Sequence, residues 1–191
     1  YQLTLEPHTS FYAQPPAHLP DENQLWDIQT AGQACLAEYG YEHYEISAYT
    51  QGQHYCQHNL NYWQFGDYLG IGAGAHSKLT DINAQHIMRF SKQTQPDVYM
   101  RTAHTPGVIA TQERLLPTTL CLEFMMNALR LTTGFTLEQF SRRTGLASAY
   151  LEKPLQQAFE AGWLHRNQNS IQTTILGQRF LDTVLELFVA V

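Results

Sequence analysis

The chain has 191 residues, of which 43% are hydrophobic, and a formal net charge of −6. This apolar content is enough for a folded core and excludes a disordered chain, while the acidic balance argues against nucleic acid or anionic lipid as a partner. No stretch approaches the ~20 consecutive apolar residues of a membrane span. The three cysteines are widely spaced and form no CxxC pair, which is typical of a reducing compartment, so we expect a cytoplasmic protein.

The beginning of the chain predicts a strand, a loop, a helix and a second strand. Alternating apolar and polar residues indicate a strand over residues 1–5, and a proline-rich loop follows. Asp21 and Gln24 have the spacing of a capping box that begins a helix, and Gly40 ends it. Residues 44–49 form the second strand. Two strands joined through a helix predict a parallel sheet.

The middle of the chain carries the predicted boundary between two domains. Residues 68–76 are a third strand-like run, rich in glycine, and Arg89-Phe90 predicts a short return strand. Residues 93–117 contain three prolines and predict a connection. We therefore expect one domain over residues 1–105 and a second over residues 106–191. Because the chain opens without Met inside a strand pattern, we also expect it to be part of a longer protein.

The second domain is predicted to be helical, with one small hairpin. The expected elements are helices over residues 118–131, 136–145 and 148–161, a β-hairpin over 163–172 and a final helix from Thr174. This order is winged-helix-like. Residues 110–191 carry seven basic and seven acidic residues, so the domain lacks the basic face that DNA binding needs, and a packing or lid module is the favoured interpretation.

The densest polar and aromatic cluster is HYCQHNLNYW, residues 54–63. A zinc site would need three or four ligands, and His54 and His58 are a single pair without a second. A haem iron needs only one or two protein ligands with aromatic walls, which His58, Tyr62 and Trp63 could supply, and Asn59 could fix the imidazole tautomer. From spacing alone, a turn in which these side chains satisfy one another is the more frequent arrangement.

Two further features are weaker candidates. The glycines of residues 70–74 are not followed by GK[ST], so they do not predict a phosphate-binding loop; they predict instead a close approach of a ligand or of another backbone segment. Glu6 and Glu45 are a possible acid–base pair, but a solvated or salt-bridged role for each is at least as frequent.

Four motifs resemble a known family. YQLTLEP, GYEHYEISAY, HNLNYW and GDYLGIGAGAHS occur in the order found in the haem-chaperone branch of the oxygen-independent coproporphyrinogen III oxidase (HemN-like) family of radical SAM proteins. The resemblance covers essentially the whole chain. It implies an α/β plus α-helical fold: the last part of a partial (β/α) radical SAM barrel, followed by a winged-helix-like C-terminal domain.

The resemblance also implies ligands. HNLNYW is similar to the HNxxYW pattern of the haem chaperones, which implies His58 as a ligand of the haem iron, supported by Asn59, Tyr62 and Trp63. Thr4 and His76 are the positions that would line a S-adenosylmethionine pocket. The family's CxxxCxxC motif for a [4Fe–4S] cluster is absent from this sequence. We therefore expect this chain to lack radical chemistry of its own.

The function expected from the resemblance is binding of haem and its transfer to an acceptor haemoprotein, with the missing N-terminal half of the barrel as a further partner. The alternative within the same family is oxidative decarboxylation of coproporphyrinogen III. A third class, a regulatory module based on the winged-helix-like half, would need a basic surface that the charge distribution does not provide.

Overall fold

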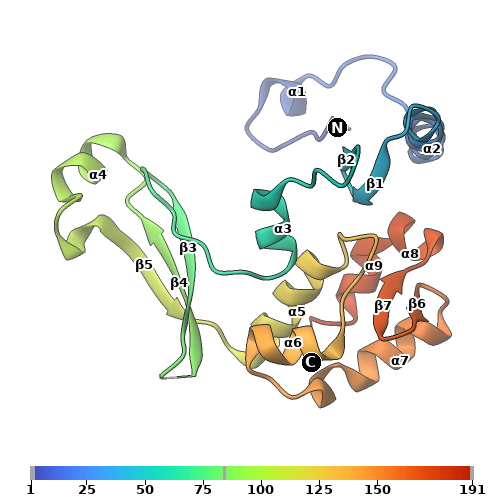
Figure 1. The fold of residues 1–191 in the computed structure, drawn as a ribbon. Coiled ribbons are helices and arrows are strands. Elements are labelled where there is room, and N and C mark those ends of the chain that lie inside the picture. The colour runs from blue at the N-terminus through green and yellow to red at the C-terminus, as the bar shows by residue number, and fades with distance from the viewer. Residues whose placement is uncertain (1–2, 84, 190–191) are drawn as a thin grey trace. The chain divides into compact units, whose positions relative to one another are not determined.

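The computed structural model describes residues 3–83 and 85–189 (Figure 1). The chain divides into two compact units, Tyr1–Tyr55 and Cys56–Val191, each of which is described by itself. This division falls at a different place from the predicted domain boundary after residue 105, which stays a prediction.

The first unit contains two helices and a short hairpin. Its elements are α1 Ser10–Ala13, α2 Glu22–Glu38, β1 Glu42–Glu45 and β2 Ala48–Thr50. The predicted capping box of α2 is confirmed: the Asp21 carboxylate accepts the Gln24 N–H at 2.9 Å, and the Gln24 side chain accepts the Asp21 N–H at 2.9 Å. Gly40 follows the helix with φ 77°, in the left-handed region that favours glycine.

The strand predictions for this unit are wrong. The predicted strand over residues 44–49 is interrupted by a tight turn, so β1 and β2 pair with each other antiparallel and Glu45 lies opposite Ala48. Residues 3–5 are not in a strand, and residues 1–2 lie outside the described part. The parallel βαβ unit is therefore absent from the described residues. A two-residue turn joins antiparallel partners locally, whereas a parallel pair requires a partner far along the chain.

The apolar stripe of α2 is open to solvent within its own unit. The helix has no buried residue, and Ile28 is 60% exposed. Together with Leu3, Leu5 and Leu25, Ile28 lines an apolar groove of about 730 Å³.

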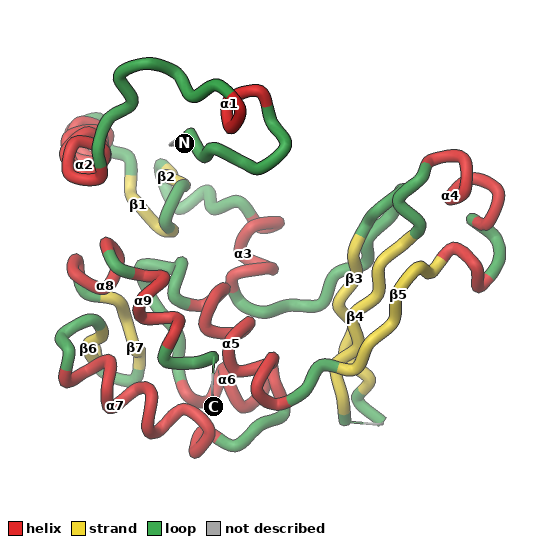
Figure 2. Tube along the Cα trace, turned by 180° about the vertical axis from the view of Figure 1, so that it is seen from behind, coloured by secondary structure: helices red, strands yellow, loops and turns green. Residues whose placement is uncertain are grey.

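The second unit begins with a helix, α3 Gln57–Trp63, and continues into an antiparallel sheet in the order β3-β4-β5. The strands are β3 His76–Asp81, β4 His86–Lys92 and β5 Ile109–Arg114, and α4 Pro96–Thr102 with the 3₁₀ turn η1 Pro106–Val108 joins β4 to β5 (Figure 2). The predicted return strand at Arg89-Phe90 is confirmed as part of β4. The predicted connection over residues 93–117 is wrong in part, because it carries α4 and β5.

The glycine-rich run is not the strand that the sequence predicts. Only Tyr68 forms a bridge, with Lys78, and β3 begins at His76, after the last of these glycines. The remaining residues form an irregular loop that runs beside the start of β3.

The rest of the second unit is mainly helical. Its elements are α5 Pro117–Ala128, α6 Leu137–Thr144, η2 Ser148–Leu151, α7 Glu152–Glu160, β6 Leu164–Asn167, β7 Ser170–Thr173, α8 Ile175–Arg179 and α9 Leu181–Glu186. Phe124, Phe140 and Phe188 are almost completely buried in the core, and the Phe124 and Phe140 rings meet edge to face at 5.2 Å. Burial of such aromatic side chains is a large part of what stabilises this core.

The predicted order of helices and hairpin in this part is confirmed, with two changes in detail. The capping box of α6, formed by Thr136 and Gln139, is present, and Gly145 ends that helix with φ 75°. Ser148 begins a 3₁₀ turn without capping it through its side chain, and the predicted final helix is divided at Phe180. The winged-helix-like assignment itself stays a prediction.

Candidate functional site

The HNLNYW motif lies on α3. The turn expected from spacing alone is wrong, because residues 57–63 form a helix. His54 precedes the helix, so His54 and His58 do not share a helix face as a metal-binding pair would. Among the described residues, no three His, Cys, Asp or Glu side chains are grouped so that they could hold a metal ion.

His58 is an exposed imidazole beside an aromatic wall. It lies one helical turn before Tyr62, and the two rings meet edge to face at 4.9 Å between centroids. Tyr62 in turn lies 4.7 Å from the Tyr68 ring. Asn59 is half-buried next to His58. The arrangement leaves a nitrogen donor accessible to a ligand while aromatic rings line one side of it.

Trp63 has different surroundings from His58. The guanidinium of Arg130 lies 4.2 Å from the centre of its ring. Its indole N–H is buried and has no hydrogen-bond acceptor among the described residues. Trp63 also lines a cavity together with residues of α5 and α6. Of the four predicted haem-site residues, the structure thus places the His58 ring 4.9 Å and the Trp63 ring 6.5 Å from the Tyr62 ring, and Trp63 has further neighbours of its own.

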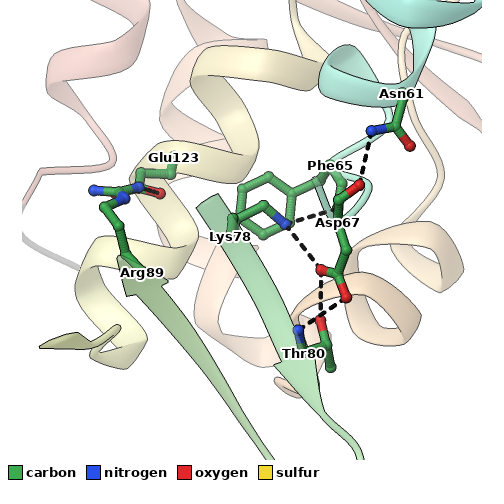
Figure 3. A network of polar contacts seen from close by, with 7 residues as sticks. All are labelled: Asn61, Phe65, Asp67, Lys78, Thr80, Arg89 and Glu123. Carbon is green, nitrogen blue, oxygen red and sulfur yellow. Dashed lines mark hydrogen bonds and ion pairs between the residues drawn. The ribbon is translucent and has the colours of Figure 1, made fainter. Parts of the chain in front are cut away.

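A polar network holds the chain that leaves α3 (Figure 3). The Asn61 side-chain amide donates to the Asp67 carbonyl at 2.9 Å. The Asp67 carboxylate accepts from the Thr80 N–H at 2.8 Å and from its hydroxyl at 2.9 Å. The buried Lys78 ammonium lies 3.6 Å from the same carboxylate and donates to the Phe65 carbonyl at 3.1 Å. The network fixes the end of α3 against β3, and none of the sequence motifs predicted it.

Burial and neighbouring charges shift the pKa values of several groups in and beside this network. Burial lowers the pKa of Lys78, and the neighbouring Asp67 carboxylate opposes this shift. On the adjacent strand, Arg89 forms ion pairs with Glu123 and Glu113, and its hydrogen bond to Glu123 raises the pKa of Arg89. Burial also raises the pKa of Tyr68. A buried lysine paired with one half-exposed carboxylate is a structural anchor, since no ligand is needed to explain it.

The predicted close backbone approach in the glycine-rich loop is confirmed. A Cβ atom on Gly70 would lie 2.0 Å from the His76 carbonyl oxygen. The Gly70 N–H donates to the Ser77 hydroxyl at 2.9 Å. A side chain at this position would separate the loop from β3, which is why glycine is required here.

Four predicted positions remain: Thr4, His76, Glu6 and Glu45. Thr4 is exposed in the first unit, and His76 is exposed at the start of β3 in the second, so a S-adenosylmethionine role for either stays a prediction. Glu6 is exposed and Glu45 is buried in the first unit, and their acid–base role also stays a prediction.

Comparisons with known proteins identify relatives. Residues 115–180 match the family model described as the HemN C-terminal domain. The haem chaperone HemW of Haemophilus influenzae is 42% identical over 189 residues, which are 98% of this chain and 48% of that protein. HemW of Escherichia coli is 40% identical over 190 residues, 100% of this chain and 49% of that protein. The chain thus spans about half the length of the curated relatives that it matches.

A solved structure has a similar fold. Coproporphyrinogen III oxidase (HemN) from Escherichia coli, a radical SAM enzyme, superposes with a TM-score of 0.63 at 17% identity, over 92% of this chain and 43% of that one. The mixed α/β plus helical fold class expected from the sequence is confirmed at this level. None of the helices in residues 3–83 and 85–189 has the length and apolar character needed to cross a bilayer.

Proposed function

We propose, on the premise that this chain belongs to the HemN-like family that includes HemW, that it binds haem through His58 and serves a cytoplasmic haem chaperone. The single observation that carries the proposal is the exposed His58 imidazole on α3 with the Tyr62 ring 4.9 Å away. The 42% identity to a haem chaperone supports the same conclusion.

The donor chemistry of this helix suits haem as a bound substrate. Haem iron takes one or two axial ligands from the protein, and an imidazole nitrogen is one of the usual ones. Tyr62 and Tyr68 supply flat apolar surface for the macrocycle, and Asn59 is placed next to His58 to orient its ring or to meet a propionate. The exposure of His58 suits a protein that must also release its haem to an acceptor haemoprotein.

Radical SAM chemistry belongs, in this proposal, to the half of the longer relatives that this chain does not span. A relative from Bos taurus carries the name radical S-adenosyl methionine domain-containing protein 1. A [4Fe–4S] cluster with S-adenosylmethionine would be held there, because the sequence in hand has no CxxxCxxC motif. Thr4 and His76 are proposed to contribute to the S-adenosylmethionine pocket of the complete protein, and no nucleic acid is proposed as a partner.

A haemin titration of the chain, followed by absorption spectroscopy, tests the proposal. We expect a saturable Soret shift that His58→Ala weakens by about tenfold or more, since even a residue that only supports a metal ligand contributes ~10–100-fold. His54→Ala is the matched control, because it removes another exposed imidazole four residues earlier and outside α3. An absent shift, or equal weakening by both variants, would overturn the assignment.

Two further measurements separate the alternatives. Cys56→Ala should leave the Soret spectrum unchanged; a loss of binding in that variant alone would replace the imidazole with a thiolate ligand. Transfer of bound haem to apomyoglobin, read from the myoglobin spectrum, tests chaperone activity. Consumption of coproporphyrinogen III by the complete protein, dependent on S-adenosylmethionine and a reductant, would instead favour the oxidase alternative.

A further inference from the structure

A cavity of about 300 Å³ lies within the second unit, between the end of α3 and the helices α5 and α6. Trp63, Phe124 and Phe135 give it an aromatic lining, and Arg142 and Arg143 add two cationic groups from the last turn of α6. Its volume is at the lower end of the range of ~300–1,000 Å³ that is usual for ligand pockets. None of the predicted functions accounts for this cavity.

The charged side chains that line the cavity are all positive. None of the described residues that line it carries a carboxylate. Neither Arg142 nor Arg143 forms an ion pair with a carboxylate of the described residues. Two neighbouring guanidinium groups without a counter-charge favour an anion, and a guanidinium is well suited to bidentate recognition of a carboxylate.

The cavity also offers a hydrogen-bond donor from a side chain of α6. Trp63 contributes only its ring, because its indole nitrogen has almost no exposed surface and a ligand in the cavity could not reach it. The side-chain oxygen of Gln139 already accepts from the Thr136 N–H at 2.7 Å, which leaves its amide NH₂ group as the donor. This donor and the two cations together, beside aromatic rings, select an acceptor-rich anion with a flat apolar body.

We infer that this cavity is a binding site for a carboxylate carried on a flat apolar body, with Arg142 and Arg143 as its charge partners and Trp63 as an aromatic wall. Two sources have this chemistry: a free small aromatic carboxylate, and a propionate arm of a haem bound at α3. The haem propionate rests on the function proposed above, whereas the free aromatic carboxylate does not.

The first test uses benzoate as the probe and needs no haem. Trp26→Phe and Trp163→Phe leave Trp63 as the sole indole of the chain, whose emission then reports on the cavity. We expect benzoate to change this emission saturably, and neutral benzamide to bind at least tenfold more weakly. A missing response to benzoate, or equal binding of benzamide, would overturn the inference.

Charge variants identify the residues responsible. Arg142→Gln with Arg143→Gln should weaken benzoate binding at least tenfold. Arg101→Gln is the matched control, since Arg101 also lies in the last turn of a helix, α4, and does not line the cavity. Circular dichroism and the urea midpoint verify that each variant folds. Unchanged benzoate affinity in the folded double variant would overturn the assignment of the two arginines.

Haemin and its dimethyl ester distinguish the two sources. If the propionates occupy the cavity, the double Arg variant weakens haemin binding several-fold and leaves the dimethyl ester unaffected. If the site takes a free carboxylate, the variant weakens benzoate alone. Because the benzoate measurements do not involve His58, failure of the haem proposal and failure of the carboxylate site give different results.

Discussion

The ammonium group of Lys78 lies 3.9 Å from the centre of the Phe65 ring and donates a hydrogen bond to the main-chain carbonyl of the same residue. One side chain of β3 thereby holds both the ring and the backbone of the residue that follows α3 closely (Figure 3). This contact links the helix that carries His58 to the sheet. Its loss should therefore lower the free energy of unfolding more than it lowers the affinity for haem.

The two partners of the ion pair should differ in their contribution to stability. Asp67→Ala leaves the buried Lys78 ammonium without its counter-charge and removes the acceptor of Thr80, so we expect a loss of about 2 kcal/mol. Lys78→Met removes the charge together with its desolvation cost. It also leaves the main-chain carbonyl of Phe65 without a hydrogen-bond donor, so we expect a loss of about 1 kcal/mol. Urea denaturation measures both, and a larger loss for Lys78→Met would contradict this account.

Lys78 should also make stability depend on alkaline pH. Burial lowers the pKa of Lys78 below its ordinary value of 10.5. Between the folded and the unfolded pKa the unfolded chain binds more protons, so this residue makes the free energy of unfolding rise with pH in that window. The difference in stability between the parent chain and Lys78→Met, followed from pH 8 to 11, should therefore grow with pH. A constant difference would show that the ammonium is not desolvated.

Cys121 should make the free energy of unfolding fall with rising pH, the opposite of the effect of Lys78. Burial raises the pKa of its thiol from 9.0 to about 11. Between these values the unfolded chain loses a proton that the folded chain keeps, so the contribution of Cys121 is fully present below pH 9 and is lost as pH rises toward 11. Between pH 8 and pH 11 the free energy of unfolding of the parent chain should fall by on the order of 2 kcal/mol because of this thiol, and Cys121→Ala should abolish that fall. An identical fall in the variant would contradict the assignment.

Thiol reactivity should distinguish the three cysteines. Cys35 and Cys56 are exposed, whereas Cys121 is buried. Ellman's reagent at neutral pH should therefore modify two thiols rapidly in the folded chain and the third only after unfolding in urea. Rapid modification of three thiols without urea would show that α5 does not protect Cys121.

Gly70→Ala tests the close approach of the glycine-rich loop to β3. The new Cβ atom would lie 2.0 Å from the His76 carbonyl oxygen, a backbone atom that can move only with its strand. We expect a loss of about 1–3 kcal/mol, in the range of overpacking. Gly107→Ala is the control, since its nearest contact would be 3.4 Å from a Thr105 side-chain atom. Equal effects of the two substitutions in urea denaturation would refute the steric explanation.

The aromatic wall beside His58 can be tested separately from the ligand itself. Tyr62→Ala removes the ring that lies 4.9 Å from the imidazole, and it should weaken haem binding several-fold. Tyr62→Phe keeps the ring and should retain most of the affinity. If both variants bind haemin as the parent does, Tyr62 has no part in the site.

Features that depend on neighbours three or four residues apart were predictable from the sequence. The capping boxes at Asp21 and at Thr136, the glycines that follow α2 and α6, and the hairpin over β6 and β7 are all present. Each is decided by hydrogen bonds within a few residues, so the residue types alone carry the information. The HNLNYW motif was recognised from the sequence as well, although its helical conformation was not.

Features that depend on distant partners were decided only by the tertiary structure. Strand pairing determined that residues 109–114 join the sheet as β5 and that residues 42–50 form a hairpin rather than one strand of a parallel sheet. The same holds for the Lys78 anchor and for the cavity beside Trp63, whose residues come from separate parts of the chain. The sequence by itself determined the ends of α2 and α6 and which motif to examine. Burial and long-range hydrogen bonding decided what surrounds that motif, because they act between residues far apart in the chain.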